Sequence, residues 1–159
     1  MFRFFLRNKV VEFSSPVIGN AMPLTAVPDQ VFAAKMVGDG MAFEAKEGII
    51  YSPVDGVVDS VFPTKHAIGI RTREGLKVII HIGIDTVNLK GNGFESLVHR
   101  NQVVKSGAKL LAFDMDLLKE KVKSLVIPMI ITNIARIETI NFSYGDVDLN
   151  TTVMTVKLK

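Results

Sequence analysis

The segment HAIGIRTREGLK, residues 66–77, continues into VIIHIGIDTV, residues 78–87, and together they decide the fold. His66–Thr72 and Leu76–Ile82 are β-rich runs on either side of Arg73-Glu74-Gly75, a spacing typical of a hairpin. Because the numbers of facing residues in this hairpin add up to about 147 to 149, His66 faces a position between 81 and 83. Adjacent strands lie about 5 Å apart, so the rings of His66 and His81 are expected side by side, unless a one-residue shift turns them to opposite faces.

Short β-rich runs separated by turn signals extend on both sides of this hairpin. Such a pattern favours a β-sandwich or a barrel. The other expected strands are Val10–Phe13, Val17–Ala21, Lys35–Val37, Met41–Phe43, Gly48–Tyr51, Gly56–Phe62, Phe94–Val98, Lys109–Phe113, Val126–Ile131, Ala135–Ile140 and Thr152–Leu158. A faint internal echo links Gly48–Val58 to Gln102–Phe113, since each contains two short strands around a turn.

Helical signals are few. Asp114–Val122 reads as one helix, with Asp114 or Asp116 as the N-cap and lysines in the last turn. Pro28–Phe32 is long enough for a single helical turn. We therefore expect an all-β protein, an antiparallel β-sandwich or barrel-like fold with one or two short helices.

Length and composition indicate one domain of 159 residues, which we place at residues 10–159 after a leader at residues 1–9. The leader, MFRFFLRNK, lacks the long apolar region and cleavage site of a secretory signal. A frayed terminus is favoured for it over docking on an anionic membrane surface. The longest apolar stretch, Leu125–Ile137, is interrupted by Pro128 and is too short to span a membrane.

Charge and cysteine content exclude several functional classes. The net charge is only +3, and no basic run is interleaved with aromatic residues, so nucleic acid is not an expected partner. The absence of cysteine excludes disulfides, thiolate metal sites and a cysteine nucleophile. It also suits a reducing compartment, and we expect a cytoplasmic location.

The histidines are the remaining candidates for chemistry. The glycine pairs at residues 38–40 and 91–93 lack the spacing and the Lys-Ser/Thr ending of a phosphate-binding loop. A buried histidine with only a structural role is the ordinary interpretation of His66 or His81 alone. Their predicted proximity favours a site for proton or phosphate transfer, because unperturbed imidazoles titrate near neutrality. His99, at the entry of a polar loop, reads as a solvated surface residue.

The same residues resemble a known family. The run HIGIDTVNLKGNGF, residues 81–94, resembles the signature around the active histidine of glucose-type IIA components of the sugar phosphotransferase system. The resemblance extends over residues 10–158. Other segments that resemble the family, in the family's order, are Val31–Ala33, Val37–Gly40, Ser52–Gly56 and Thr64–Ala67.

The resemblance implies both a fold and a chemistry. It implies a sandwich of the duplicated hybrid motif type and a phosphocarrier without a cofactor. By resemblance, His81 is phosphorylated on Nε2 by the phosphocarrier protein HPr and passes the group to a cysteine of the IIB domain of a sugar permease. His66 is similar to a second histidine that hydrogen-bonds the phosphoryl group, and Thr64 to a threonine that supports it. Whether the chain also has regulatory target proteins, and which sugar it serves, stay open.

The family also has an apolar patch around its active histidine that docks partners. An apolar ring excludes water from a labile phosphoryl group, and carboxylates at the rim pair with a basic partner. The matching apolar positions are Val31, Phe32, Val37, Phe62 and Ile79, and the matching acidic positions are Asp29 and Asp85. Each of the apolar positions is also compatible with an ordinary place in the core.

Two alternatives come from other functional classes. A zinc peptidase of the LytM type has a related fold and needs three protein ligands. It is disfavoured because Ile70 and Gly83 stand where such enzymes have ligands, although His66 and His81 have the donor atoms to bind zinc jointly. No metal is required for the phosphocarrier. A lipoyl-type carrier would need a modifiable lysine at a hairpin tip, and the sequence shows none in the required context.

Overall fold

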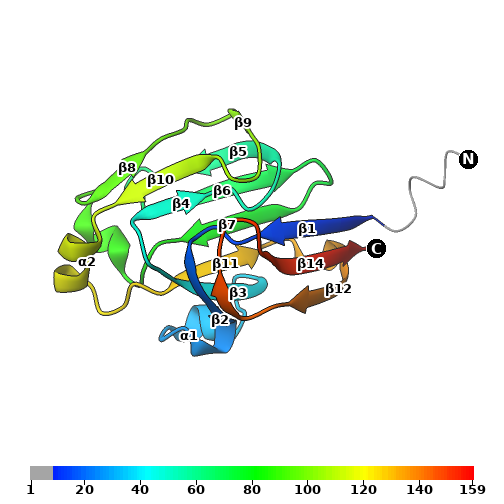
Figure 1. Ribbon diagram of the computed structural model, residues 1–159, viewed down its shortest axis with the longest axis horizontal. Coiled ribbons are helices and arrows are strands. Elements are labelled where there is room, and N and C mark those ends of the chain that lie inside the picture. The colour runs from blue at the N-terminus through cyan, green and yellow to red at the C-terminus, as the bar shows by residue number, and fades with distance from the viewer. Residues whose placement is uncertain (1–8) are drawn as a thin grey trace, which may run out of the picture.

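The protein is a β-structure in which three antiparallel sheets pack together, as seen in a computed structural model that describes residues 9–159 (Figure 1). Residues 1–8, nearly all of the expected leader, lie outside the described residues. The largest sheet has the order β13-β2-β3-β11-β7-β6-β5-β9, and the smaller ones have the orders β1-β14-β12 and β4-β10-β8. The expectation of an all-β fold with a few short helices is confirmed.

The elements are short. The largest sheet contains β13 (Gly145–Val147), β2 (Gly19–Pro23), β3 (Asp39–Ala45), β11 (Ile127–Ile131), β7 (Lys77–His81), β6 (Ala67–Thr72), β5 (Gly56–Val61) and β9 (Val103–Val104). The smaller sheets contain β1 (Val10–Ser14), β14 (Thr152–Leu158), β12 (Ile137–Phe142), β4 (Ile49–Tyr51), β10 (Lys109–Phe113) and β8 (Phe94–Ser96). The helices are α1 (Gln30–Ala33) and α2 (Met115–Lys121), and the 3-10 turns are η2 (Leu24–Ala26), η3 (Thr86–Leu89) and η4 (Ile134–Arg136).

Strand β7 is covered on both faces, which explains its nearly continuous apolar sequence. Val78 and Ile80 are fully buried in the main core between the sheets. Ile79 points the other way and packs against a smaller apolar cluster made by Leu24, Val27, Ala42, Ile84 and Ile130. Because strand positions alternate in period two, His81 lies on the same face of β7 as Ile79.

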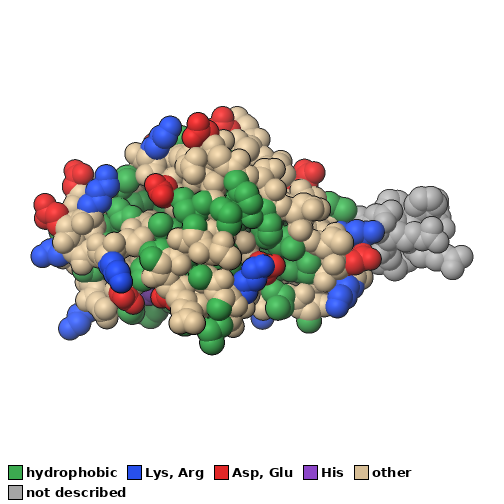
Figure 2. All heavy atoms as spheres, turned by 90° about the horizontal axis from the view of Figure 1, so that it is seen from below, with side chains coloured by type: hydrophobic (Ala, Val, Ile, Leu, Met, Phe, Trp, Pro, Cys, Tyr) green, Lys and Arg blue, Asp and Glu red, His purple; other side chains and the backbone are tan. Residues whose placement is uncertain are grey.

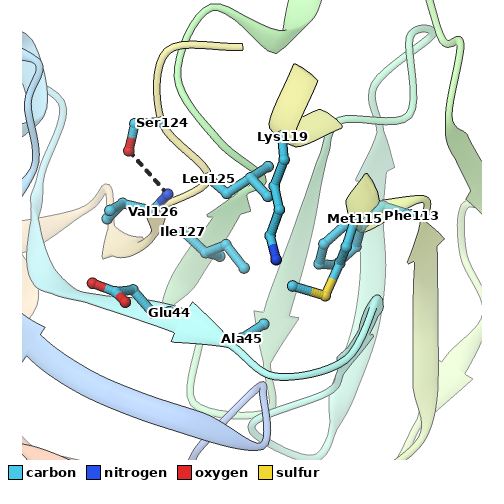
Figure 3. Close-up of a pocket in the computed structure, with 9 residues that line it drawn as sticks. All are labelled: Glu44, Ala45, Phe113, Met115, Lys119, Ser124, Leu125, Val126 and Ile127. Carbon is cyan, nitrogen blue, oxygen red and sulfur yellow. Dashed lines mark hydrogen bonds between the residues drawn. The ribbon is translucent and has the colours of Figure 1, made fainter. Parts of the chain in front are cut away.

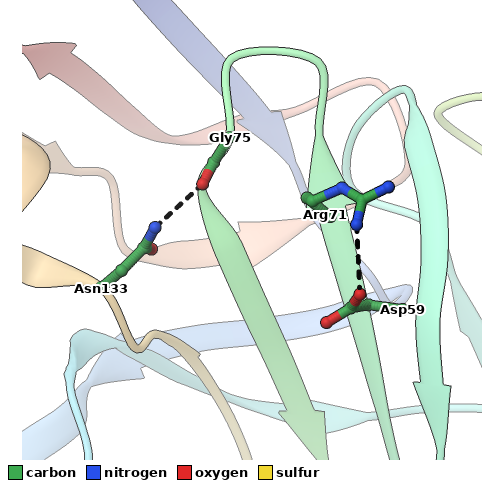
Figure 4. Close-up of polar contacts among 4 residues, drawn as sticks. All are labelled: Asp59, Arg71, Gly75 and Asn133. Carbon is green, nitrogen blue, oxygen red and sulfur yellow. Dashed lines mark hydrogen bonds and ion pairs between the residues drawn. The ribbon is translucent and has the colours of Figure 1, made fainter.

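The β6–β7 hairpin has the predicted register. Ala67 faces His81 and Ile70 faces Val78, so the numbers of facing residues add up to 148. Asn133 fixes the turn of the hairpin from outside. Its side-chain nitrogen donates to the Gly75 carbonyl at 2.8 Å (Figure 4). Its side-chain oxygen accepts from the Lys77 backbone at 2.9 Å. Because both contacts are made near the turn, they anchor the hairpin at the end opposite the histidines.

The segments that echo each other in sequence pair with each other in space. Strands β4 and β5 come from Gly48–Val58, and β10 and β9 come from Gln102–Phe113. β4 pairs with β10 in one sheet, and β5 pairs with β9 in another. The two segments of the faint repeat are therefore neighbours in both sheets.

Two helices form near their predicted places, and one predicted strand does not form. The N-cap of α2 is Asp114, whose carboxylate accepts a hydrogen bond from the Leu117 backbone at 3.1 Å. The strand predicted at Lys35–Val37 is wrong. Those residues form the turn that leaves α1, since Met36 N donates to Val31 O and Lys35 has a positive φ of 59°. The apolar residues Met36 and Val37 gave a strand-like sequence pattern, but both side chains are exposed and do not belong to a sheet.

Within the described part of the chain, no helix is long and apolar enough to cross a membrane.

Candidate active site

His66 and His81 lie side by side, as their spacing predicted. Their ring centroids are 4.8 Å apart and the ring planes make an angle of 78°. The residue His66 is almost completely buried, with 4% of its surface exposed, whereas His81 is partly exposed. The pair therefore presents one accessible imidazole backed by a buried one.

The register of the hairpin alone does not explain why the two histidine rings are in contact. Ala67 faces His81, and His66 O accepts from Ile82 N at 2.7 Å. Neighbouring strand positions alternate, so a regular ladder with this register places His66 and His81 on opposite faces. His66, however, precedes the first residue of β6 and follows Lys65, whose φ is 58°. Because His66 lies outside the regular strand, its side chain does not follow the alternation and is able to lie beside His81.

A backbone hydrogen bond fixes the proton of the His81 ring. Nδ1 of His81 lies 2.8 Å from the Gly83 carbonyl oxygen, which is able only to accept. Nδ1 therefore carries the hydrogen, and in the neutral ring the lone pair is on Nε2. Gly83 makes this contact with a φ of +74°, and a Cβ there would come within 2.7 Å of Thr86 Cγ2.

A side-chain hydrogen bond orients the ring of His66. Thr64 Oγ1 lies 2.5 Å from His66 Nδ1. When the threonine hydroxyl donates to this nitrogen, the hydrogen of the neutral ring is on Nε2. Thr64 is therefore placed to select the tautomer of His66.

Burial keeps both imidazoles neutral. Desolvation, followed by repulsion from His81, lowers the pKa of His66 to about 4. Desolvation also lowers the pKa of His81, opposed by the hydrogen bond to Gly83 and by the nearby carboxylates of Asp29 and Asp85. A neutral His81 keeps the nucleophilic lone pair that a positively charged ring lacks.

We expect His66 to remain uncharged at physiological pH and to protonate only near pH 4. The pKa of the unfolded chain stays at its ordinary value of 6.5, so the unfolded state binds more protons between these two values. The contribution of His66 to the free energy of unfolding is therefore present above pH 6.5 and is lost as the pH falls towards 4. NMR titration of the ring protons checks this, and a His66 midpoint near 6.5 would contradict it.

Two phenylalanines flank the histidine pair. The ring centroid of Phe32 is 5.2 Å from that of His81, and the ring centroid of Phe62 is 5.5 Å from that of His66. Phe32 reaches the site from α1, whose N-cap Asp29 accepts from Val31 N at 2.8 Å. The expected grouping of Phe32, Phe62 and the two histidines is therefore present.

The other residues expected in the patch divide into exposed and partly buried positions. Val31 and Val37, around α1, are 44% and 39% exposed. Ile79 is only partly exposed, because it packs against the smaller apolar cluster. Figure 2 shows hydrophobic side chains gathered across the middle of the face seen from below in Figure 1, on the side where α1 lies.

Sequence reasoning missed two contacts of the site. It gave no role to the Gly83 carbonyl, because any residue has such a group and only the fold directs it at His81. Nor did it place Phe94, whose ring centroid is 6.5 Å from that of His66.

Comparison with known proteins gives the family. Residues 11–137 match the model of the family described as phosphoenolpyruvate-dependent sugar phosphotransferase system, EIIA 1. The chain belongs to this family. Its fold also resembles the structure of glucose permease IIA from Mycoplasma capricolum, with a TM-score of 0.88 and 40% identity over 93% of this chain and 96% of that one. The resemblance to glucose-type IIA components is thus confirmed at the level of the family.

The site does not have the ligands that the zinc peptidase alternative requires. In residues 9–159 no group of three or more His, Cys, Asp or Glu side chains is arranged to hold a metal ion. A catalytic zinc site needs three protein ligands, and the His66–His81 pair supplies two.

Proposed function

We propose that the protein is a phosphocarrier that accepts a phosphoryl group from phospho-HPr on Nε2 of His81 and transfers it to a cysteine of a IIB domain. In the first step a bond from Nε2 to phosphorus forms while the phosphorus–nitrogen bond of phospho-HPr breaks. In the second step the cysteine thiolate forms a sulfur–phosphorus bond while the Nε2–phosphorus bond breaks, which regenerates neutral His81. The observation that carries the proposal is the bond from His81 Nδ1 to the Gly83 carbonyl, which leaves Nε2 as the free nucleophile.

His66 supports the same proposal as a donor. With Thr64 holding Nδ1, the Nε2–H of His66 is available to the oxygens of a phosphoryl group on the adjacent ring. A fixed donor of this kind stabilises the charge that develops on those oxygens during transfer. Because the ring is buried and its pKa is low, it acts as a neutral donor whose proton stays in place.

The apolar surroundings suit a docking surface. We assign partner docking to Val31, Phe32, Val37, Phe62 and Ile79, with Asp29 and Asp85 at the rim. Phe32 and Phe62 limit the access of water to a group held between the histidines. Asp29 and Asp85 both act electrostatically on His81, so they lie close enough to attract a basic partner. We propose HPr and IIB as alternating occupants of this surface, in the cytoplasm.

The substitution Val37→Asp tests the docking surface. Val37 is exposed, so an aspartate is tolerated by the free protein but becomes an unpaired charge in the complex. We expect the affinity for HPr to fall about tenfold or more, with little change in the melting temperature. Titration calorimetry and thermal unfolding measure the two effects.

Val103→Asp is the matched control for this substitution. Val103 is 76% exposed on β9. β9 pairs with Gly56 and Val57 at the start of β5, whereas Phe62 follows the last residue of β5. HPr affinity should be unchanged in this variant. A large loss of stability in Val37→Asp would show that Val37 belongs to the core, and equal losses of affinity in both variants would argue against a specific surface.

The function itself is tested by charging the purified protein with enzyme I, HPr and phosphoenolpyruvate. The expected result is a gain of the mass of one phosphoryl group, lost again when IIB and its sugar permease are added. A protein that gains no mass when HPr is fully phosphorylated would contradict the proposal.

A further inference from the structure

A pocket of about 340 Å³ lies outside the histidine site, between α2, β3 and the segment that leads into β11 (Figure 3). Its volume falls in the range of small-molecule sites. Most of its wall is apolar and comes from Ala45, Phe113, Met115, Leu125, Val126 and Ile127. A pocket of this composition favours a ligand with an apolar body.

One cation is directed into this apolar pocket. Lys119 projects from α2 so that its ammonium group lies over the apolar wall (Figure 3). The ion pairs found in residues 9–159 do not include Lys119. Glu44 also lines the pocket, but its carboxylate lies at the margin and points away from Lys119. The pocket therefore offers a single positive charge to its occupant.

We propose that this pocket binds a small monocarboxylate with an apolar body. The carboxylate accepts hydrogen bonds from the Lys119 ammonium, and the body covers the apolar wall. A single ammonium matches one negative charge, whereas a phosphate group with two charges calls for a second cation, and Lys119 is the one cationic side chain in the lining.

The wall of this pocket also touches the loop that holds His81. Ser124 O accepts from Ile84 N at 3.0 Å, and a Cβ on Gly83 would lie 3.0 Å from Ser124 O and 3.7 Å from Leu125 Cδ2. Gly83 is the residue whose carbonyl accepts the His81 hydrogen. Leu125 therefore lines the pocket and lies beside Gly83, and the Ile84 amide, bonded to Ser124, is a natural reporter of binding.

Titration of the whole protein with sodium octanoate tests the proposal. We expect saturable binding with a dissociation constant below about 1 mM, together with NMR shifts of the Ile84 and Leu125 amides. Lys119→Met keeps the length of the side chain and removes its charge, so affinity should fall about tenfold or more. Lys121→Met, on the same helix but outside the pocket, should bind octanoate like the original protein.

Octylamine distinguishes charge recognition from apolar partition. It should bind more weakly than octanoate, because its ammonium is repelled by Lys119. The proposal is overturned if octanoate does not saturate, if octylamine binds as well, or if Lys119→Met and Lys121→Met bind octanoate equally. None of these measurements depends on phosphoryl transfer, so their failure leaves the proposed function intact.

Discussion

Replacing His81 by alanine is expected to abolish phosphoryl uptake from phospho-HPr. Uptake needs a neutral nitrogen with a free lone pair, and Nε2 of His81 is the accessible one in the histidine pair. The fold should be unchanged, because His81 is partly exposed at the end of β7 and its backbone pairing with Ala67 does not use the side chain. Radiolabel incorporation and circular dichroism measure the two expectations.

His99→Ala is the control for this experiment. His99 is exposed in the loop before β9, where its Nδ1 lies 3.0 Å from the Arg100 carbonyl. Its replacement should leave labelling at the original rate. If His81→Ala is labelled at that rate as well, the assignment of the nucleophile is wrong.

Replacing His66 by glutamine is expected to separate the two steps of transfer. Glutamine keeps a donor of similar reach, so phospho-HPr should still charge His81. Onward transfer requires the phosphoryl oxygens to be held in line while charge develops on them, which is the role given to His66. The flexible amide lacks the orientation that Thr64 gives the ring, and we expect transfer to IIB to slow about a hundredfold or more.

A two-step assay measures this effect. Each variant is first charged with labelled phosphate, and the IIB domain is then added while the loss of label is followed. Equal charging in the first step provides the internal control. Normal onward transfer by the His66→Gln variant would refute the proposed role and leave His66 as a structural residue.

The central hairpin was predictable because a short turn sequence lies between two apolar runs and therefore determines which residues of the two strands face each other. Arg73–Gly75 fixes the register, and a register sum of 148 follows within the predicted range. Strand β13, with three residues, was not predicted, because so short a run that begins with glycine carries no periodic signal. At Lys35–Val37 the apolar sequence pointed to a strand, yet these residues project from the turn after α1.

The candidate site was predictable in its residue types and less so in its geometry. The hairpin spacing brought His66 and His81 to one end, but their contact depends on the departure of His66 from the ladder at Lys65. The tautomer of His81 depends on the Gly83 carbonyl. The orientation of a backbone carbonyl is not predictable from the residue type. Partner docking at Val31 and Val37 stays a prediction, since exposure alone does not identify a partner.

The most direct test of the central claim is to locate the phosphoryl group on the charged protein. Phosphorus NMR distinguishes the two ring nitrogens of phosphohistidine, and mass spectrometry of proteolytic fragments identifies the residue. The account predicts one phosphoryl group on Nε2 of His81, because Nδ1 is occupied by its bond to Gly83. A phosphoryl group on Nδ1 of His81, or on His66 or His99, would contradict it.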